Sequence, residues 1–118
     1  MVVVLGAAAV GLISTGAITA EKTKRLSSAQ IRAKLAGMQL TDEVHYRFVY
    51  ERDGTLRSYS MGVKKIGKWV VEKDELCLDL GETDDGCYQV TLSGERIEMT
   101  PTGLGGTIDG ILQPAERN

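Results

Sequence analysis

The chain has 118 residues, which is enough for one compact domain and too few for two. Hydrophobic residues make up 42% and charged residues 25% of the chain, a globular composition that excludes a disordered, collagen-like or polytopic membrane protein. The net charge of -2 gives no basic surplus for nucleic-acid binding, and one His and two Cys leave little material for a metal site or a Cys–His nucleophile. We therefore expect no nucleic-acid partner, no cofactor and no enzymatic activity.

The amino-terminal segment has the character of a secretory leader. Residues 1–20 carry no charged side chain, and Val2 to Ile13 form a continuous apolar run. This run is shorter than the roughly 20 residues of a membrane-spanning helix, whereas its length and the small residues that end at Ala20 fit a signal peptide. We expect 1–20 to be a signal peptide, cleaved after Ala17 or Ala20, and 21–118 to form a single β domain with an N-terminal helix.

The leader also departs from the usual signal pattern. No basic residue precedes the apolar run, and Lys22, Lys24 and Arg25 follow it, where positive charge opposes translocation. A start codon placed too late would explain the missing basic residues. The alternatives are an uncleaved anchor, which would be the chain's one contact with a membrane, and a cytosolic apolar tail.

One helix is predicted after the leader. Ser27 or Ser28 can cap its amino terminus, because Ser27 and Gln30 have the spacing of a capping box. Gly37 supplies the stop. Apolar side chains between these signals recur at helical spacing and would form the buried stripe: Ile31, Leu35 and Met38.

From residue 43 onward the apolar period changes from that of a helix to that of a strand. Three two-residue turns set the expected strand registers: Asp53–Gly54, Lys73–Asp74 and Ser93–Gly94. These turns give the following pairs: Phe48 with Tyr59, Tyr46 with Met61, Trp69 with Leu78, Val71 with Leu76, Val90 with Ile97, and Tyr88 with Met99. The pairs place one apolar set on the inward face: Tyr46, Phe48, Tyr59, Met61, Trp69, Val71, Leu76, Leu78, Tyr88, Val90, Ile97 and Met99.

The opposite, outward face is expected to be polar, and it carries Arg47, Glu51, Ser58, Ser60, Glu72, Asp79, Gln89 and Thr91. A last strand is predicted over Thr107–Leu112. The expected fold is mainly β (α+β): an antiparallel meander of six or seven strands with one N-terminal helix. So large an apolar face must be covered, so the meander is either a curled sheet under the helix or a small barrel with the helix at one end.

Cys77 and Cys87 are the only thiols of the chain. An even pair in a small exported domain is typical of a disulfide, and the ten-residue separation is too long for a C-x-x-C redox motif. Placing the two cysteines opposite each other also sets Leu76 opposite Tyr88. The disulfide predicts a periplasmic or secreted protein.

Five of the six aromatic residues fall on the inward face and form the candidate site: Tyr46, Phe48, Tyr59, Trp69 and Tyr88. They are either core residues or the wall of a barrel that holds a small apolar ligand. His45 is expected on the surface, since no G-x-S-x-G motif accompanies it. The acidic stretch from Asp74 to Asp85 lacks the spacing of a calcium loop and is expected to be a solvated hairpin tip. We expect no metal site and no catalytic residue.

Three segments carry a family resemblance: Gly67–Val71 (GKWVV), Asp74–Cys77 (DELC) and Cys87–Val90 (CYQV). Together with Leu26–Ile31 and Asp53–Gly54, they resemble small exported proteins of unknown function from Gram-negative bacteria. The resemblance spans roughly residues 26 to 92 and implies an exported β domain in which Cys77 is joined to Cys87. It implies no activity.

These observations favour an exported, non-enzymatic domain that acts through its surface, as an interaction or envelope-associated protein. Its partner would be an unknown protein or envelope component. The alternative from another class is a carrier of a small apolar ligand that uses the interior of the barrel.

Overall fold

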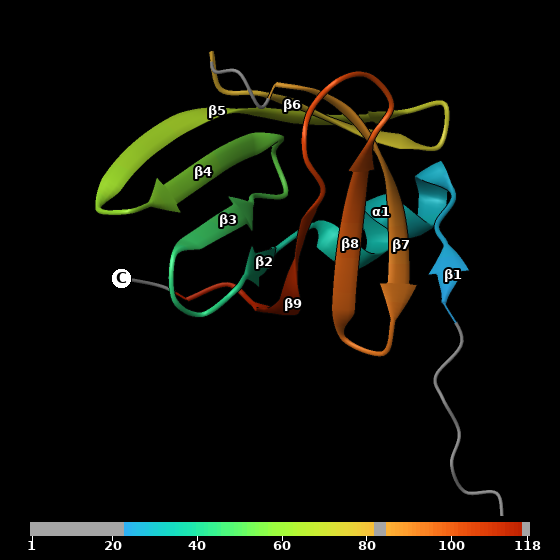
Figure 1. Cartoon of the computed structure of the whole chain (residues 1–118), viewed down its shortest axis with the longest axis horizontal. Helices are drawn as coiled ribbons and strands as arrows, with labels where there is room; N and C mark the ends of the chain where they lie inside the picture. Colours follow the sequence, from blue (N-terminus) through green and yellow to red (C-terminus); the bar gives the residue numbers. More distant parts are fainter. Residues whose placement is uncertain (1–22, 82–84, 117–118) are drawn as a thin grey trace, which may run out of the picture.

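The computed structural model describes residues 23–81 and 85–116, so the predicted signal segment 1–20 lies outside the described residues. One helix and nine strands follow one another along this part of the chain (Figure 1): β1 (Lys24–Arg25), α1 (Ser28–Leu35), β2 (Met38–Thr41), β3 (Tyr46–Tyr50), β4 (Thr55–Ser60), β5 (Val63–Glu72), β6 (Glu75–Asp79), β7 (Gly86–Ser93), β8 (Arg96–Pro101) and β9 (Ile108–Pro114).

The strands β2 to β9 form a closed antiparallel barrel, in which each strand pairs with the next and β9 returns to pair with β2. The short β1 lies on β7 at Leu92 and Thr91, beyond the residues that pair with β6. The predicted meander is therefore confirmed, and of the two predicted forms it is the barrel. The strand predicted over Thr107–Leu112 is β9, and β1 and β2 were not predicted.

The helix begins as the sequence indicates. Ser27 accepts a hydrogen bond from the Gln30 amide, and the Gln30 side chain accepts one from the Ser27 amide, which completes the capping box. The helix ends at Leu35, and Gly37 takes a left-handed φ of +80° that turns the chain directly into β2. Met38 therefore belongs to β2 rather than to the helical stripe.

Two contacts fasten α1 to the β5–β6 hairpin. Ser28 and Asp74 exchange hydrogen bonds of 2.7 Å, each backbone amide donating to the other side chain. Arg32 donates to the Val71 carbonyl at 3.0 Å. With the helix held in this way, its buried Ile31 and Leu35 join the apolar cluster of the barrel interior. No helix of the described residues is long and apolar enough to cross a membrane.

Two of the expected registers are confirmed. Lys73 and Asp74 both have positive φ, as a type I′ turn requires, and Trp69 faces Leu78 across the hairpin. Cys77 lies opposite Cys87 on the outward face, where the predicted disulfide is formed.

The register between β3 and β4 differs from the prediction by one residue. Phe48 pairs with Ser58 rather than with Tyr59, because the hairpin loop holds three residues, Arg52 to Gly54, instead of two. A one-residue shift moves every side chain of β4 to the other face. Ser58 is consequently buried, and the prediction that Tyr59 and Met61 point inward is wrong. Ser60 likewise shares the inward side with Ser58, and Met61, just after β4, is 75% exposed.

The register between β7 and β8 differs by two residues. The turn is formed by Gly94 and Glu95, so that Val90 faces Met99 instead of Ile97. An even shift changes the partners but keeps the faces. The side chains of Val90, Ile97 and Met99 are therefore buried as expected.

The interior is filled by side chains from all sides of the barrel. Tyr50 is fully buried, and its ring meets the Trp69 ring edge-on with 5.5 Å between centroids. The Trp69 indole nitrogen donates to the Glu51 carbonyl at 2.8 Å, which satisfies its one polar group. Further buried members of this cluster are Leu26, Leu40, Phe48, Leu56, Val71, Leu76, Leu78, Tyr88, Val90, Ile97, Met99 and Leu112.

The backbones of β5 and β6 come very close together at Gly67, in the middle of β5. A Cβ atom at this position would lie far inside van der Waals contact of the Asp79 carbonyl oxygen on β6. The part of β5 up to Lys68 pairs with β4, and the part from Lys68 onward pairs with β6. Glycine in a strand commonly marks such a close backbone approach.

Gly67→Ala is expected to lower the free energy of unfolding by about 2–3 kcal/mol, because β5 and β6 must move apart to admit a methyl group. Urea denaturation measures this change. Gly103→Ala is the matched control, since a Cβ at Gly103 meets no atom within 4 Å. Equal stability of the two variants would show that β5 and β6 do not approach each other at Gly67.

Candidate functional site

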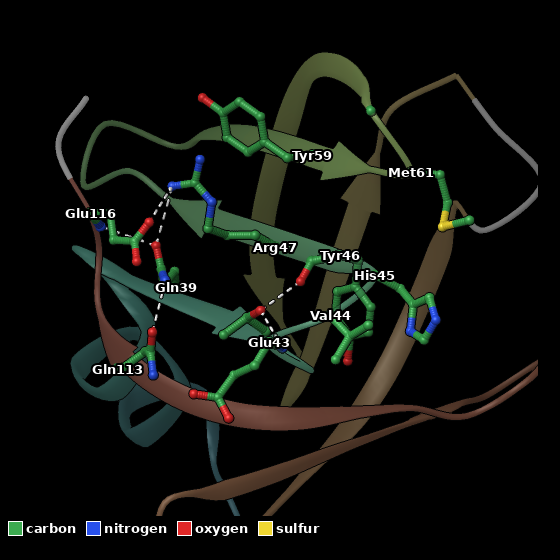
Figure 2. A pocket seen from close by; sticks show the side chains of 12 residues that line it. Gln39, Glu43, Val44, His45, Tyr46, Arg47, Tyr59, Met61, Gln113 and Glu116 are labelled. Atoms are coloured by element: carbon green, nitrogen blue, oxygen red, sulfur yellow. Dashed lines mark hydrogen bonds and ion pairs between the residues drawn. The ribbon is translucent and has the colours of Figure 1, made fainter.

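The outer face of β2, β3 and β4 carries two adjoining cavities of about 470 and 730 Å³. Three residues line both cavities: Arg47, Tyr59 and Glu116. We call the two cavities together the Arg47 trough, and Figure 2 shows the smaller one, with Arg47 and Tyr59 lying between Glu116 and Met61.

The centre of the trough is a cross-strand row. Arg47 on β3 pairs with Tyr59 on β4, and Tyr59 pairs with Lys64 on β5. The Arg47 guanidinium lies 4.1 Å from the centroid of the Tyr59 ring, and the Lys64 ammonium lies 5.8 Å from it. Both distances allow a cation–π interaction. Tyr59 belongs to this row because the β3–β4 hairpin has a three-residue loop instead of the predicted two-residue loop.

Gln39 forms the floor beside the row. Its side chain projects from the outer face, yet it is almost fully buried. The Gln39 amide nitrogen donates to Gln113 at 3.0 Å, and the Gln39 oxygen accepts from the Glu116 backbone amide at 3.0 Å and from Arg47 at 3.4 Å. These bonds, drawn in Figure 2, tie β2, β3 and the carboxyl-terminal segment together under the trough. A floor held in this way is preorganised for binding.

Glu116 is ion-paired with Arg47, but the pair is loose. The two charged groups are 3.8 Å apart, and the Glu116 side chain is 60% exposed while that of Arg47 is 18% exposed. The Glu116 end of the pair is open to water, which screens the attraction, so the pair contributes little stability. The Glu116 carboxylate can therefore leave Arg47 at small cost.

Three other charged side chains of the larger cavity, Arg57, Glu51 and Asp53, have local partners. Arg57 donates to Glu51 at 2.7 Å, and this hydrogen bond raises the pKa of Arg57. The Asp53 carboxylate accepts from the Thr55 amide at 2.9 Å, and this bond lowers the pKa of Asp53. Of the other cations that line the trough, Arg47 has only the loosely held Glu116 as an ion-pair partner, and Lys64 and Arg52 have none among the described residues.

The far wall of the smaller cavity is a tight turn built on Asp42. One carboxylate oxygen of Asp42 accepts from the backbone amides of Val44, His45 and Tyr46, and the other lies 2.8 Å from the His45 ring. Desolvation raises the pKa of Asp42, but these hydrogen bonds outweigh it and hold the pKa well below its usual range. The exposed apolar side chains of Val44 and Met61 flank the turn.

This lowered pKa predicts how acid affects stability. The ionised Asp42 stabilises the fold above the pKa of an unfolded Asp, about 3.9, and the contribution is lost as the pH falls from there through the folded pKa. Asp42→Asn is therefore expected to be less stable than the wild type at pH 7. The difference in the free energy of unfolding between the two is expected to shrink as the pH falls below about 4. Urea denaturation at several pH values tests this, with Glu98→Gln as the control for net charge. A difference independent of pH would contradict it.

The predicted site residues are divided between the two sides of the barrel wall. Phe48, Trp69 and Tyr88 are buried inside, and Tyr46 is partly buried with its hydroxyl donating to the Asp109 carbonyl. Burial, together with the charges of Asp42 and Asp109, raises the pKa of Tyr46 to about 12. Tyr59 lies outside, against Arg47. Whether the inward aromatic residues form a ligand wall stays a prediction.

The alternation of residues along the sequence predicts that Arg47 lies on the outer face, but no sequence motif indicates a binding site there. Gln39 lies in the unpredicted β2, and Glu116 follows the last strand, so their meeting with Arg47 depends on barrel closure.

Within residues 23–81 and 85–116, no cluster of three His, Cys, Asp or Glu side chains is suited to hold a metal ion. Comparison with known proteins finds no matching family model, no matching curated protein and no matching solved structure.

Proposed function

We propose that this protein is an exported, non-enzymatic domain that binds a partner protein or envelope component through the Arg47 trough. The observation that carries the proposal is the contrast between the two sides of the barrel wall. Inside, the aromatic side chains are packed in one apolar cluster. Outside, a preorganised polar floor lies under a stacked cation and two adjoining cavities.

Two observations support export. The Cys77–Cys87 disulfide indicates an oxidising environment outside the cytoplasm. The uncharged segment 1–20 has the length and the small terminal residues of a signal peptide. A periplasmic or secreted protein, as implied by the resemblance to small exported proteins of Gram-negative bacteria, accounts for both.

Site-specific photo-crosslinking in the periplasm of a Gram-negative host tests the proposal. A photoreactive side chain at Met61 or Lys64, which line the trough, is expected to give one recurrent crosslinked product. The control position is Glu98, which is exposed on β8 and lines neither cavity. Crosslinked products at Glu98 alone, or the same set of crosslinked products at all three positions, would mean that the trough is not the binding surface.

A second candidate function is the carriage of a small apolar ligand, because barrels of eight strands hold one such ligand in some proteins. Its interior wall would include Phe48, Trp69 and Tyr88. Titration with an apolar fluorescent probe separates the candidates. Saturable binding with quenching of Trp69 would favour the carrier, and the surface proposal expects none.

A further inference from the structure

We propose that the Arg47 trough recognises a carboxylate on an extended peptide segment of the partner, and that this carboxylate displaces that of Glu116. The inference rests on the proposed function and specifies the chemistry of the ligand. It makes Glu116 an internal competitor for the binding site.

The first argument is the local charge. Arg47 and Lys64 lie on the two sides of Tyr59 in one cross-strand row, and Glu116 is the only carboxylate among the described residues that is ion-paired with Arg47. Lys64 has no ion-pair partner among those residues. A row of two cations with one loosely held, largely exposed counter-ion favours the arrival of another carboxylate.

The second argument is the geometry of Arg47. Its guanidinium is held against the Tyr59 ring, and its donor contact to Gln39 is long, at 3.4 Å. A guanidinium has five N–H donors in one plane and binds a carboxylate with two parallel hydrogen bonds. The contact to Glu116 is 3.8 Å, which is longer than such hydrogen bonds. Arg47 is therefore oriented for a carboxylate that binds more closely than Glu116 does.

The third argument is that an extended acidic segment already lies in the trough. The Ala115 amide donates to the Gly37 carbonyl at 3.3 Å, and the Glu116 amide donates to the Gln39 side chain at 3.0 Å. The carboxyl-terminal segment of the chain thus shows that the trough accommodates an extended backbone with an acidic side chain beside Arg47.

The lining favours a peptide over a polyanion. Glu43, Glu51 and Asp53 lie along the trough, and their charges would repel a nucleic acid or a polyphosphate. Exposed Val44 and Met61 at the end of the smaller cavity offer apolar contacts to neighbouring side chains of a peptide. A single carboxylate at Arg47, with apolar residues beside it, fits this mixed surface.

Titration by NMR with two short peptides tests the inference. The probes are acetyl-Ala-Glu-Ala-Leu-amide and the same peptide with Gln in place of Glu. In the wild type, the acidic peptide is expected to shift the Gln39 side-chain amide and the Tyr59 backbone amide, and to bind about 10-fold or more tightly than the neutral one. Arg47→Gln is expected to remove this preference, and Arg47→Lys to restore part of it, since Lys keeps the charge but not the planar donors.

Two further variants complete the experiment. Glu116→Gln is expected to strengthen binding of the acidic peptide about 2- to 5-fold, the range of a released exposed ion pair. Arg25→Gln makes the same charge change as Arg47→Gln on exposed β1 and is expected to leave binding unchanged. Amide spectra with native dispersion show that each variant is folded.

The outcomes separate the two proposals. Equal binding of both peptides at the trough would overturn the carboxylate inference while supporting the trough as a binding surface. Absence of shifts at Gln39 and Tyr59 with either peptide would overturn the inference, and the crosslinking result would then decide the proposed function. Unchanged affinity in Glu116→Gln would show that Glu116 does not compete.

Discussion

Trp69→Ala is expected to lower the free energy of unfolding by about 3–5 kcal/mol, the range for removal of a buried large aromatic side chain. Trp69 is buried against Tyr50 and opposite Leu78, so its loss leaves a cavity in the centre of the barrel. The substitution also removes the hydrogen bond from the indole to the Glu51 carbonyl, which holds β5 against the β3–β4 hairpin. Urea denaturation monitored by circular dichroism measures the change.

Val70 is the matched control for Trp69. It is the next residue of β5, and its side chain points outward and is 50% exposed. Val70→Thr is expected to change stability by no more than about 0.5 kcal/mol. The reverse ranking of the two variants would mean that β5 presents its other face to the interior.

Replacing both Cys77 and Cys87 by Ser is expected to cost about 2–5 kcal/mol, as for other small exported domains that lose a disulfide. The bridge joins β6 to β7 across the outward face. Without it, the unfolded chain gains freedom that the cross-link removes. Denaturation under oxidising conditions measures the cost.

Denaturation of the wild type with and without a reductant measures the contribution of the disulfide to the free energy of unfolding independently. The reduced wild type and the double Ser variant are expected to agree, because both lack the cross-link. A double variant that unfolds together with the oxidised wild type would show that the disulfide does not stabilise the barrel.

The helix and the β5–β6 hairpin could be predicted because short-range signals specify them. Ser27 and Gln30 form a capping box within one turn, and Lys73 and Asp74 adopt a type I′ turn, one of the two types that suit a two-residue hairpin. The apolar period then fixes which side of each strand faces inward. Such signals act over few residues, so the sequence alone contains them.

The β3–β4 hairpin shows where these signals are insufficient. Asp53 and Gly54 fit a loop of two or of three residues, and the choice decides the face of every residue on β4. The structure has the longer loop, which buries Ser58 and turns Tyr59 to the outer face. The shorter loop would have placed one more aromatic side chain inside, so apolar content favoured the wrong register.

The Arg47 trough could not be predicted because barrel closure assembles it. Gln39 and Gln113 meet through the pairing of β2 with β9, which are separated by most of the domain. No local pattern marks the pairing of the first strand of a barrel with its last. The outward position of Arg47 was predictable, but its neighbours were not.

The most direct test of the account is the position of the Tyr59 ring, since the trough and its proposed ligand both depend on it. Nuclear Overhauser contacts between the Tyr59 ring protons and the side chains of Arg47 and Lys64 are the expected result. Contacts from the Tyr59 ring to Phe48 or to the Trp69 indole, without contacts to Arg47, would contradict it, because they would place Tyr59 inside the barrel and leave Arg47 without its stacking partner.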